Sequence, residues 1–180
     1  MISIIKGNVT YLDGVMNLYH RIQNDFKKRG IDIYQDNEYP NREIFEKDLS
    51  NSDRTLLLLD NNLVIGFITS DSGANFAKDI FNSAKDASSF LEKYKLSDYQ
   101  GRMVAYERLM IDPDYRNQGY GSKLLTILDQ KYSGAFIIFL AHEANHNAIK
   151  LYGNLKYTCL GLENFEFGKY YIFTKNQLKI

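Results

Sequence analysis

The sequence is most informative at Leu109-Met110-Ile111-Asp112-Pro113-Asp114-Tyr115-Arg116-Asn117-Gln118-Gly119-Tyr120-Gly121-Ser122-Lys123-Leu124-Leu125. An apolar strand ends at Pro113, a polar turn follows, and Gly119 and Gly121 open a helix. The first N–H groups of a helix lack partners and carry partial positive charge, and glycines let a phosphate approach the backbone. Arg116 adds a permanent positive charge. The segment therefore predicts a pyrophosphate site.

Two better-known phosphate motifs do not fit this segment. The dinucleotide-binding fingerprint needs a third glycine or alanine where Leu124 stands. The P-loop needs Gly-Lys followed by Ser or Thr, which the sequence lacks. Taken alone, Arg-x-x-Gly-x-Gly also fits an ordinary surface turn.

Outward from this segment, apolar runs of strand length alternate with runs of helical spacing. Strands are expected at 2–5, 55–59, 63–70, 103–111, 135–141, 157–162 and 170–174. Thr10 can cap a first helix that ends just before Gly30, and Pro40-Asn41 opens a second. Further helices are expected at 119–132 and 145–155, with one or two short helices around 76–81 and 87–94. This alternation predicts an α/β (α+β) sheet covered by helices. The chain has two prolines and no linker-like stretch, so we expect one domain over residues 1–180.

A second motif follows about twenty residues later, at Asn145-His146-Asn147-Ala148-Ile149-Lys150-Leu151-Tyr152-Gly153-Asn154-Leu155-Lys156-Tyr157. Together with residues 109–125, it resembles the GNAT superfamily of acyl-CoA-dependent N-acetyltransferases. Lys156-Tyr157 stands where that family usually has Gly-Phe. The resemblance implies a single GNAT-like domain with a mixed central sheet of about six or seven strands, flanked by helices. Its central strands, 103–111 and 135–141, would splay apart.

The resemblance also implies acetyl-CoA as the cosubstrate. Backbone groups near Leu109–Ile111 would bind the pantetheine arm and polarise the thioester carbonyl. The residues implied in cofactor binding are Leu109, Met110, Ile111, Arg116, Asn117, Gln118, Gly119, Tyr120, Gly121, Ser122 and Asn145. Capping of the last helix is the alternative role for Asn145.

Catalysis in such an enzyme is a direct attack of an amine on the acetyl group. The resemblance implies that Tyr152 protonates the departing CoA thiolate, as a general acid. Glu107, a charged residue within an apolar strand, is the candidate base. A salt bridge of Glu107 with Arg102 or Arg108 is the alternative, with a water chain accepting the proton.

Two other functions compete with acetyl transfer. His142-Glu143-Ala144-Asn145-His146 matches the His-Glu-x-x-His pattern of zinc metallopeptidases, with Glu166 as a distant third ligand. That pattern needs both histidines on one helix, whereas His142 directly follows an apolar strand. We therefore expect no metal. The other alternative is a non-catalytic CoA-binding module.

Charge and composition bear on partners. The formal net charge is zero, which argues against a nucleic-acid partner. The sequence has no run of eighteen apolar residues, so no membrane span is expected. Its single cysteine is expected to be a small core residue and favours a reducing, cytoplasmic setting. The expected acceptor is a small-molecule or peptide amine, and a homodimer is an allowed assembly.

The acceptor is expected to be cationic. Residues 1–100 carry a net charge of −3 and residues 101–180 a net charge of +3, although count noise explains that split equally well. Asp36 and Glu38 either attract the amine or are solvated loop charges, which is the simpler interpretation. The aromatic residues considered for an acceptor pocket are Tyr34, Tyr39, Phe67, Phe165 and Phe167, and most of them could equally be core residues.

Overall fold

The computed structural model of the chain describes all residues except 32, 34–38, 74–83, 98–100 and 176–180. A seven-stranded mixed sheet has the strand order β1-β2-β3-β4-β5-β7-β6. The strands are β1 (Ile2–Lys6), β2 (Thr55–Asp60), β3 (Leu63–Ser72), β4 (Met103–Ile111), β5 (Phe136–His142), β6 (Thr158–Phe165) and β7 (Gly168–Lys175). The helices are α1 (Leu12–Lys28), α2 (Arg42–Ser50), α4 (Ala84–Lys93), α5 (Tyr120–Lys131) and α6 (His146–Asn154), with short 3-10 turns η1 (Val9–Tyr11) and η2 (Pro113–Tyr115). This is the α/β sheet covered by helices that the sequence predicted.

The chain is divided into two compact units. The first comprises Met1–Ser70 and Glu107–Asp129, and the second comprises Asp71–Tyr106 and Gln130–Ile180. The boundary therefore passes through β4, after Tyr106. One domain over residues 1–180 stays a prediction.

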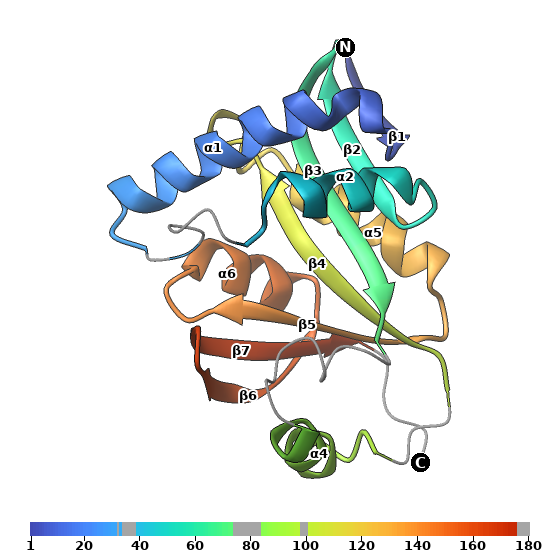
Figure 1. Cartoon of the computed structure of the whole chain (residues 1–180), viewed down its shortest axis with the longest axis vertical. Coiled ribbons are helices and arrows are strands. Elements are labelled where there is room, and N and C mark those ends of the chain that lie inside the picture. The colour runs from blue at the N-terminus through green and yellow to red at the C-terminus, as the bar shows by residue number, and fades with distance from the viewer. Residues whose placement is uncertain (32, 34–38, 74–83, 98–100, 176–180) are drawn as a thin grey trace. The chain divides into compact units, whose positions relative to one another are not determined.

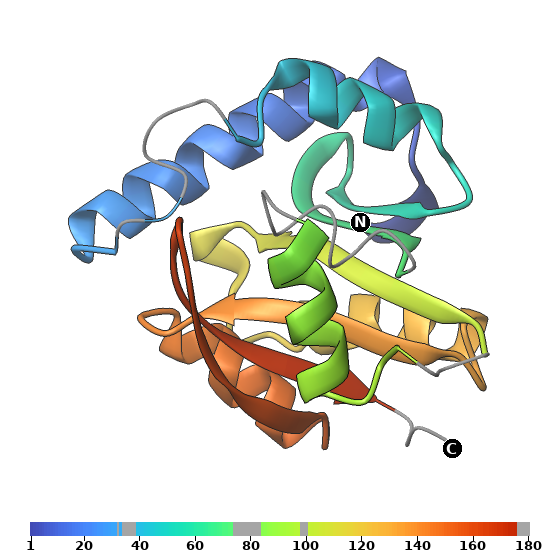
Figure 2. The ribbon, with the colours of Figure 1, turned by 60° about the horizontal axis from the view of Figure 1, so that its bottom comes forward.

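The first unit is built on three antiparallel strands. β1 pairs with β2, and β2 pairs with β3 around a turn in which Asn61 has a φ of 54°. Figures 1 and 2 show α1 and α2 on one face of these strands and α5 on the other. Aromatic rings fill the space under α1 and α2: the ring of Phe45 lies 5.3 Å from that of Tyr19 and 5.5 Å from that of Phe67. Phe67 is thus a core residue, which is one of the two positions that the sequence allowed for it.

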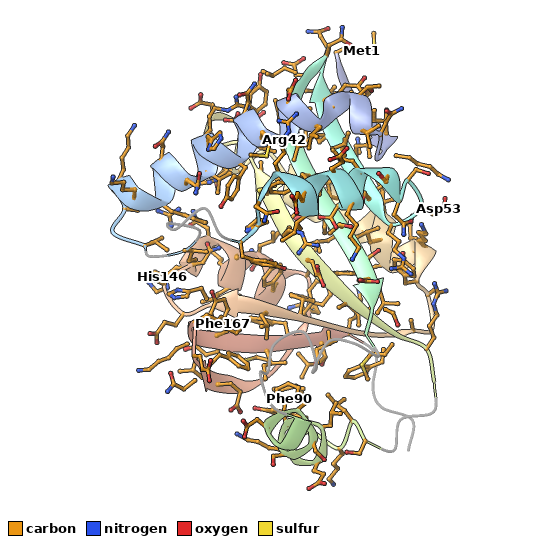
Figure 3. The ribbon with its side chains drawn as sticks, in the orientation of Figure 1. Met1, Arg42, Asp53, Phe90, His146 and Phe167 are labelled. Carbon is orange, nitrogen blue, oxygen red and sulfur yellow. The ribbon has the colours of Figure 1, made fainter. Side chains whose placement is uncertain are left out.

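The second unit buries side chains on both faces of β5 and β7. β5 runs antiparallel to β7, and β7 antiparallel to β6. On one face, Phe90 from α4 packs in a cluster with Ile138 and Ile172 (Figure 3). On the other, the rings of Phe139 and Phe173 stack 5.9 Å apart. Neighbouring residues of a strand point to opposite faces, so two layers cover the nearly continuous apolar run of β5.

β4 is paired with β5 over only part of its length. Their parallel ladder joins Met103, Val104 and Ala105 to Phe136, Ile137 and Ile138. Residues 106–111 lie beyond this ladder. The end of pairing halfway along two central strands agrees with the predicted splay.

β6 forms an edge of the sheet and is irregular. Its register against β7 shifts between Cys159 and Gly161, which marks a bulge. Lys93 and Tyr94, at the end of α4, both bind the Glu163 carboxylate on β6. Cys159 is exposed, so its prediction as a core residue is wrong.

No helix among the described residues is long and apolar enough to cross a membrane.

Candidate active site

The end of β4 is fixed by a buried carboxylate. Asp112 accepts a hydrogen bond from the N–H of Asp114 (3.0 Å) and another from Arg21 Nε on α1 (2.7 Å). Its own N–H donates to the Ile65 carbonyl on β3 (2.9 Å). Since Asp112 is buried, these contacts satisfy a charge that would otherwise be costly to place there. They set the point from which the turn to α5 departs.

The turn then presents a run of backbone donors. Among the described residues, no acceptor binds the backbone N–H groups of Gln118 to Ser122, and the first helical bond of α5 comes from Lys123, which donates to the Gly119 carbonyl (3.0 Å). Asn117 and Gly119 have left-handed φ values of 61° and 81°. A Cβ atom added at Gly119 would meet no atom within 4 Å, so the space in front of this turn is open. Such a row of N–H groups at a helix start is suited to an anion.

Arg116 is bound to α1. Its Nη1 lies 2.5 Å from Asp25 Oδ2, and its Nε donates to the Ile111 carbonyl (3.2 Å). Burial opposes ionisation of Asp25, but Arg116 and Arg29 outweigh it and lower the pKa of that carboxyl. The guanidinium of Arg116 therefore links the turn to α1 through an ion pair with Asp25, which neutralises part of its charge.

Leu109, Met110 and Ile111 occupy the last part of β4, beyond its ladder with β5. Met110 is buried, whereas Leu109 and Ile111 are half-buried. This is where the sequence predicted groups for a pantetheine arm. All three belong to the same unit as the turn at residues 116–122.

Glu107 lies next to Arg108, and the two form an ion pair of 2.5 Å between Oε2 and Nη2. The salt bridge that the sequence offered as an alternative to catalysis is therefore present, with Arg108 as the partner. The Glu107 side chain keeps 25% of its surface exposed. An ion pair does not remove its capacity to accept a proton, so the base role stays a prediction.

Tyr152 lies in α6 and is buried, with its ring 4.6 Å from that of Phe139 and 5.2 Å from that of Phe173. No hydrogen bond joins its hydroxyl to a residue that the structure describes. Burial raises the pKa of the Tyr152 phenol above its ordinary value. The hydroxyl is therefore protonated at neutral pH and able to donate.

Asn145 caps α6. Its side-chain oxygen accepts a hydrogen bond from the N–H of Ala148 (3.4 Å). This is the alternative role that the sequence offered, and contact with CoA stays a prediction.

The histidines of the His-Glu-x-x-His match do not share a helix. His142 ends β5. His146, labelled in Figure 3, begins α6. His142 Nδ1 also accepts the N–H of Ala144 (3.1 Å). Within the part of the chain that the structure describes, no group of three or more His, Cys, Asp or Glu residues could hold a metal ion, so nothing here supports the metallopeptidase alternative.

The remaining predicted acceptor residues fall in different places. Tyr39 is exposed, and its hydroxyl accepts a hydrogen bond from Arg108 Nη1 (2.5 Å). The rings of Phe165 and Phe167 stack at 5.2 Å where β6 turns into β7. Tyr34, Asp36 and Glu38 lie outside the described residues.

Sequence reasoning did not assign Asp48 and Asp25 any role. Both bind arginines that come later in the chain by 60 and 91 residues, Arg108 and Arg116 respectively. The only local indication of such an ion pair in the sequence was the adjacent pair Glu107-Arg108 inside an apolar strand. Such a pair predicts a buried partner without saying which.

Comparison with known proteins identifies a family. The model described as "Acetyltransferase (GNAT) family" matches residues 15–157. A search of curated protein sequences found no match.

Several solved structures share the fold. An acetyltransferase of the GNAT family from Streptococcus agalactiae is 19% identical, with a TM-score of 0.76 over 99% of this chain and 96% of that one. The PaiA N-acetyltransferase from Thermoplasma acidophilum, in complex with coenzyme A, is 18% identical, with a TM-score of 0.68 over 98% and 99%. NAA60 from Arabidopsis thaliana, in complex with acetyl-CoA, is 16% identical, with a TM-score of 0.62 over 97% and 98%.

Proposed function

The chain belongs to the acetyltransferase (GNAT) family, and from that premise we propose that it transfers an acetyl group from acetyl-CoA to a primary amine. The observation that carries the proposal is the row of N–H groups from Gln118 to Ser122 at the start of α5, none of which is bound by an acceptor among the described residues. It is supported by the solved complexes of PaiA with coenzyme A and of NAA60 with acetyl-CoA, which have the same fold. Bound acetyl-CoA supplies an activated thioester.

Residues of the turn hold the cosubstrate. The N–H groups of Gln118 to Ser122 bind its pyrophosphate, because they lie at a helix start and have no acceptor in the part of the chain that the structure describes. Arg116, fastened to Asp25, contributes positive charge and holds the turn in shape. Backbone groups at Leu109–Ile111 bind the pantetheine arm.

Tyr152 donates the proton that the departing thiolate needs. Its hydroxyl has no partner among the described residues, and burial keeps the phenol protonated. A general acid must be protonated before the step in which it acts, and Tyr152 meets this condition across the neutral range.

Glu107 accepts the proton that the amine loses, directly or through a water chain. It is a half-buried carboxylate on the same strand as Leu109–Ile111. The acceptor is a cationic small-molecule or peptide amine, which the net charge of −3 over residues 1–100 favours. The single cysteine is the basis for placing the enzyme in the cytoplasm.

Binding of acetyl-CoA tests the first part of the proposal. Gly119→Asp should abolish binding in calorimetry, since it places bulk and negative charge in front of the N–H row. Gly134→Asp is the matched control, because Gly134 has a φ of +82° and equally open surroundings but lies in another turn. If wild-type protein shows no binding at millimolar acetyl-CoA, or if both variants bind alike, the assignment of this turn is wrong.

Turnover tests the second part. A panel of primary amines that includes diamines, amino acids and peptide N-termini should reveal at least one acceptor by CoA release. Binding of acetyl-CoA without release of CoA by any amine would instead support a non-catalytic CoA-binding module.

A further inference from the structure

Arg108 has an unusual backbone for its place in the fold. It lies within β4, yet its φ is +54°, a left-handed value that residues other than glycine seldom adopt. Its side chain is only 8% exposed. A strained backbone and a buried charge at one position are maintained only where the surrounding contacts enforce them.

The guanidinium of Arg108 holds three groups at once. Nε and Nη2 bind the two carboxylate oxygens of Asp48 on α2, at 2.8 and 3.0 Å. Nη2 also lies 2.5 Å from Glu107 Oε2. Nη1 donates to the Tyr39 hydroxyl at 2.5 Å. All three nitrogens are used, and a lysine ammonium lacks this planar fork.

The charges of this cluster leave a negative surplus on its accessible side. Burial opposes the charge on Arg108, but Glu107, Tyr39 and Asp48 outweigh it and raise the pKa of the guanidinium. Asp48 is 12% exposed, whereas Glu107 is 25% exposed and Tyr39 55%. The guanidinium of Arg108 lies over the Tyr39 ring, 5.8 Å from its centre, so one face of that ring is already occupied. The exposed part of the Glu107 carboxylate and the other face of the Tyr39 ring are the groups that can attract an ammonium group.

We propose that Arg108 is a positioning residue that holds the Glu107 carboxylate and the Tyr39 ring as one binding site for the ammonium group of the acceptor. This rests on the proposed function and extends it to a substrate-recognition site. The bound ammonium transfers one proton to Glu107: an N–H bond breaks, an O–H bond forms, and a neutral amine and a neutral carboxyl result. Asp48 neutralises the buried guanidinium.

Kinetics of three variants test the proposal with the best amine of the panel. Arg108→Lys should lower kcat/KM for the amine about tenfold or more, since misplaced groups lose much of their effect. Tyr39→Phe keeps the ring but removes the hydroxyl that accepts a hydrogen bond from Arg108 Nη1, and it should raise the KM for the amine. Both should bind acetyl-CoA within about twofold of wild type. The control is Arg42→Lys, which changes a surface ion pair between α2 and Asp13 (Figure 3).

A binding measurement needs no turnover. Calorimetric titration with n-butylammonium chloride should show binding to wild type and Arg42→Lys and weaker binding to Arg108→Lys and Tyr39→Phe, while n-pentanol should not bind. Absence of n-butylammonium binding to wild type, or equal binding to all four proteins, overturns the inference. The inference is also overturned if Arg108→Lys loses thermal stability while Tyr39→Phe keeps wild-type kinetics. In that case the role of Arg108 is only to join α2 to β4. Failure of acetyl-CoA to bind would overturn the proposed function instead.

Discussion

Tyr152 combines two properties at the scale of a single residue. Its ring is packed among Phe139, Phe173 and Tyr157, and its hydroxyl has no partner among the described residues. Packing fixes the position of the oxygen, and burial, by raising the pKa, keeps its proton in place. A group held in this way needs little reorganisation to donate a proton.

Tyr152→Phe should therefore lower turnover by roughly 10²–10⁴-fold, the range for a lost general acid. The affinity for acetyl-CoA should change little, because the ring remains. Steady-state kinetics with a proven amine and calorimetry with acetyl-CoA measure the two effects separately. Tyr157→Phe is the comparison variant, since it removes a hydroxyl from a neighbouring buried tyrosine. Equal rates for wild type and Tyr152→Phe would exclude Tyr152 as the acid.

Helix starts show at the scale of elements why some boundaries were predictable. The side chains of Asn41 and Asn145 each accept a hydrogen bond from the N–H three residues later, and so they cap α2 and α6. Both helices begin where expected. At the first helix, the sequence favoured Thr10 as the cap, but Asn8 caps η1, which leads into α1. Asn8 and Thr10 can both act as a helix cap, and because the 3-10 turn η1 precedes α1, the cap lies at Asn8.

The two roles considered for Asn145 make different predictions. Asn145→Ala should lower the free energy of unfolding by about 1 kcal/mol, the usual cost of a lost cap. Asn145→Ser restores an acceptor and should recover most of that stability. Urea unfolding measures this, and calorimetry measures acetyl-CoA binding alongside. If serine restores stability but not affinity for acetyl-CoA, the amide contacts the cosubstrate as well as capping α6.

At the scale of the whole molecule, prediction from sequence reached the fold and the turn but not the long-range contacts. Residues 109–125 carry strand, turn and helix signals within one short segment, so their structure follows from local chemistry. Arg108 instead gathers Tyr39 and Asp48, which lie 69 and 60 residues away in sequence. Phe67 was offered as a pocket residue because an aromatic side chain suits a ligand and a core equally well.

Carboxylates held by basic partners set the response of the fold to acid. The pKa of Asp25 and that of Glu163 are lowered: burial opposes this, but Arg116 and Arg29 outweigh it at Asp25, and Lys93 and Tyr94 at Glu163. A carboxyl with a lower pKa in the folded state stabilises the protein above its unfolded pKa of about 4, and this stability is lost as the pH falls through the folded value.

The free energy of unfolding should therefore fall as the pH is lowered below about 4. Asp25→Asn and Glu163→Gln should each be less stable than wild type at pH 7 and lose less on acidification, so the curves converge. Urea unfolding from pH 7 to pH 3 measures this. Parallel curves for wild type and variants would show that these two ion pairs do not contribute to acid sensitivity.

The edge strand of a sheet has unpaired backbone groups with which a strand of a second molecule can pair, and β6 is such an edge strand. The register shift between Cys159 and Gly161 interrupts its row of backbone donors and acceptors. Glu163 adds a charge farther along the strand, where Lys93 and Tyr94 hold it. An incoming strand would have to straighten the bulge before it could pair along the full length of β6. These features work against fibril growth in concentrated solution, and a change that flattened β6 would remove that protection.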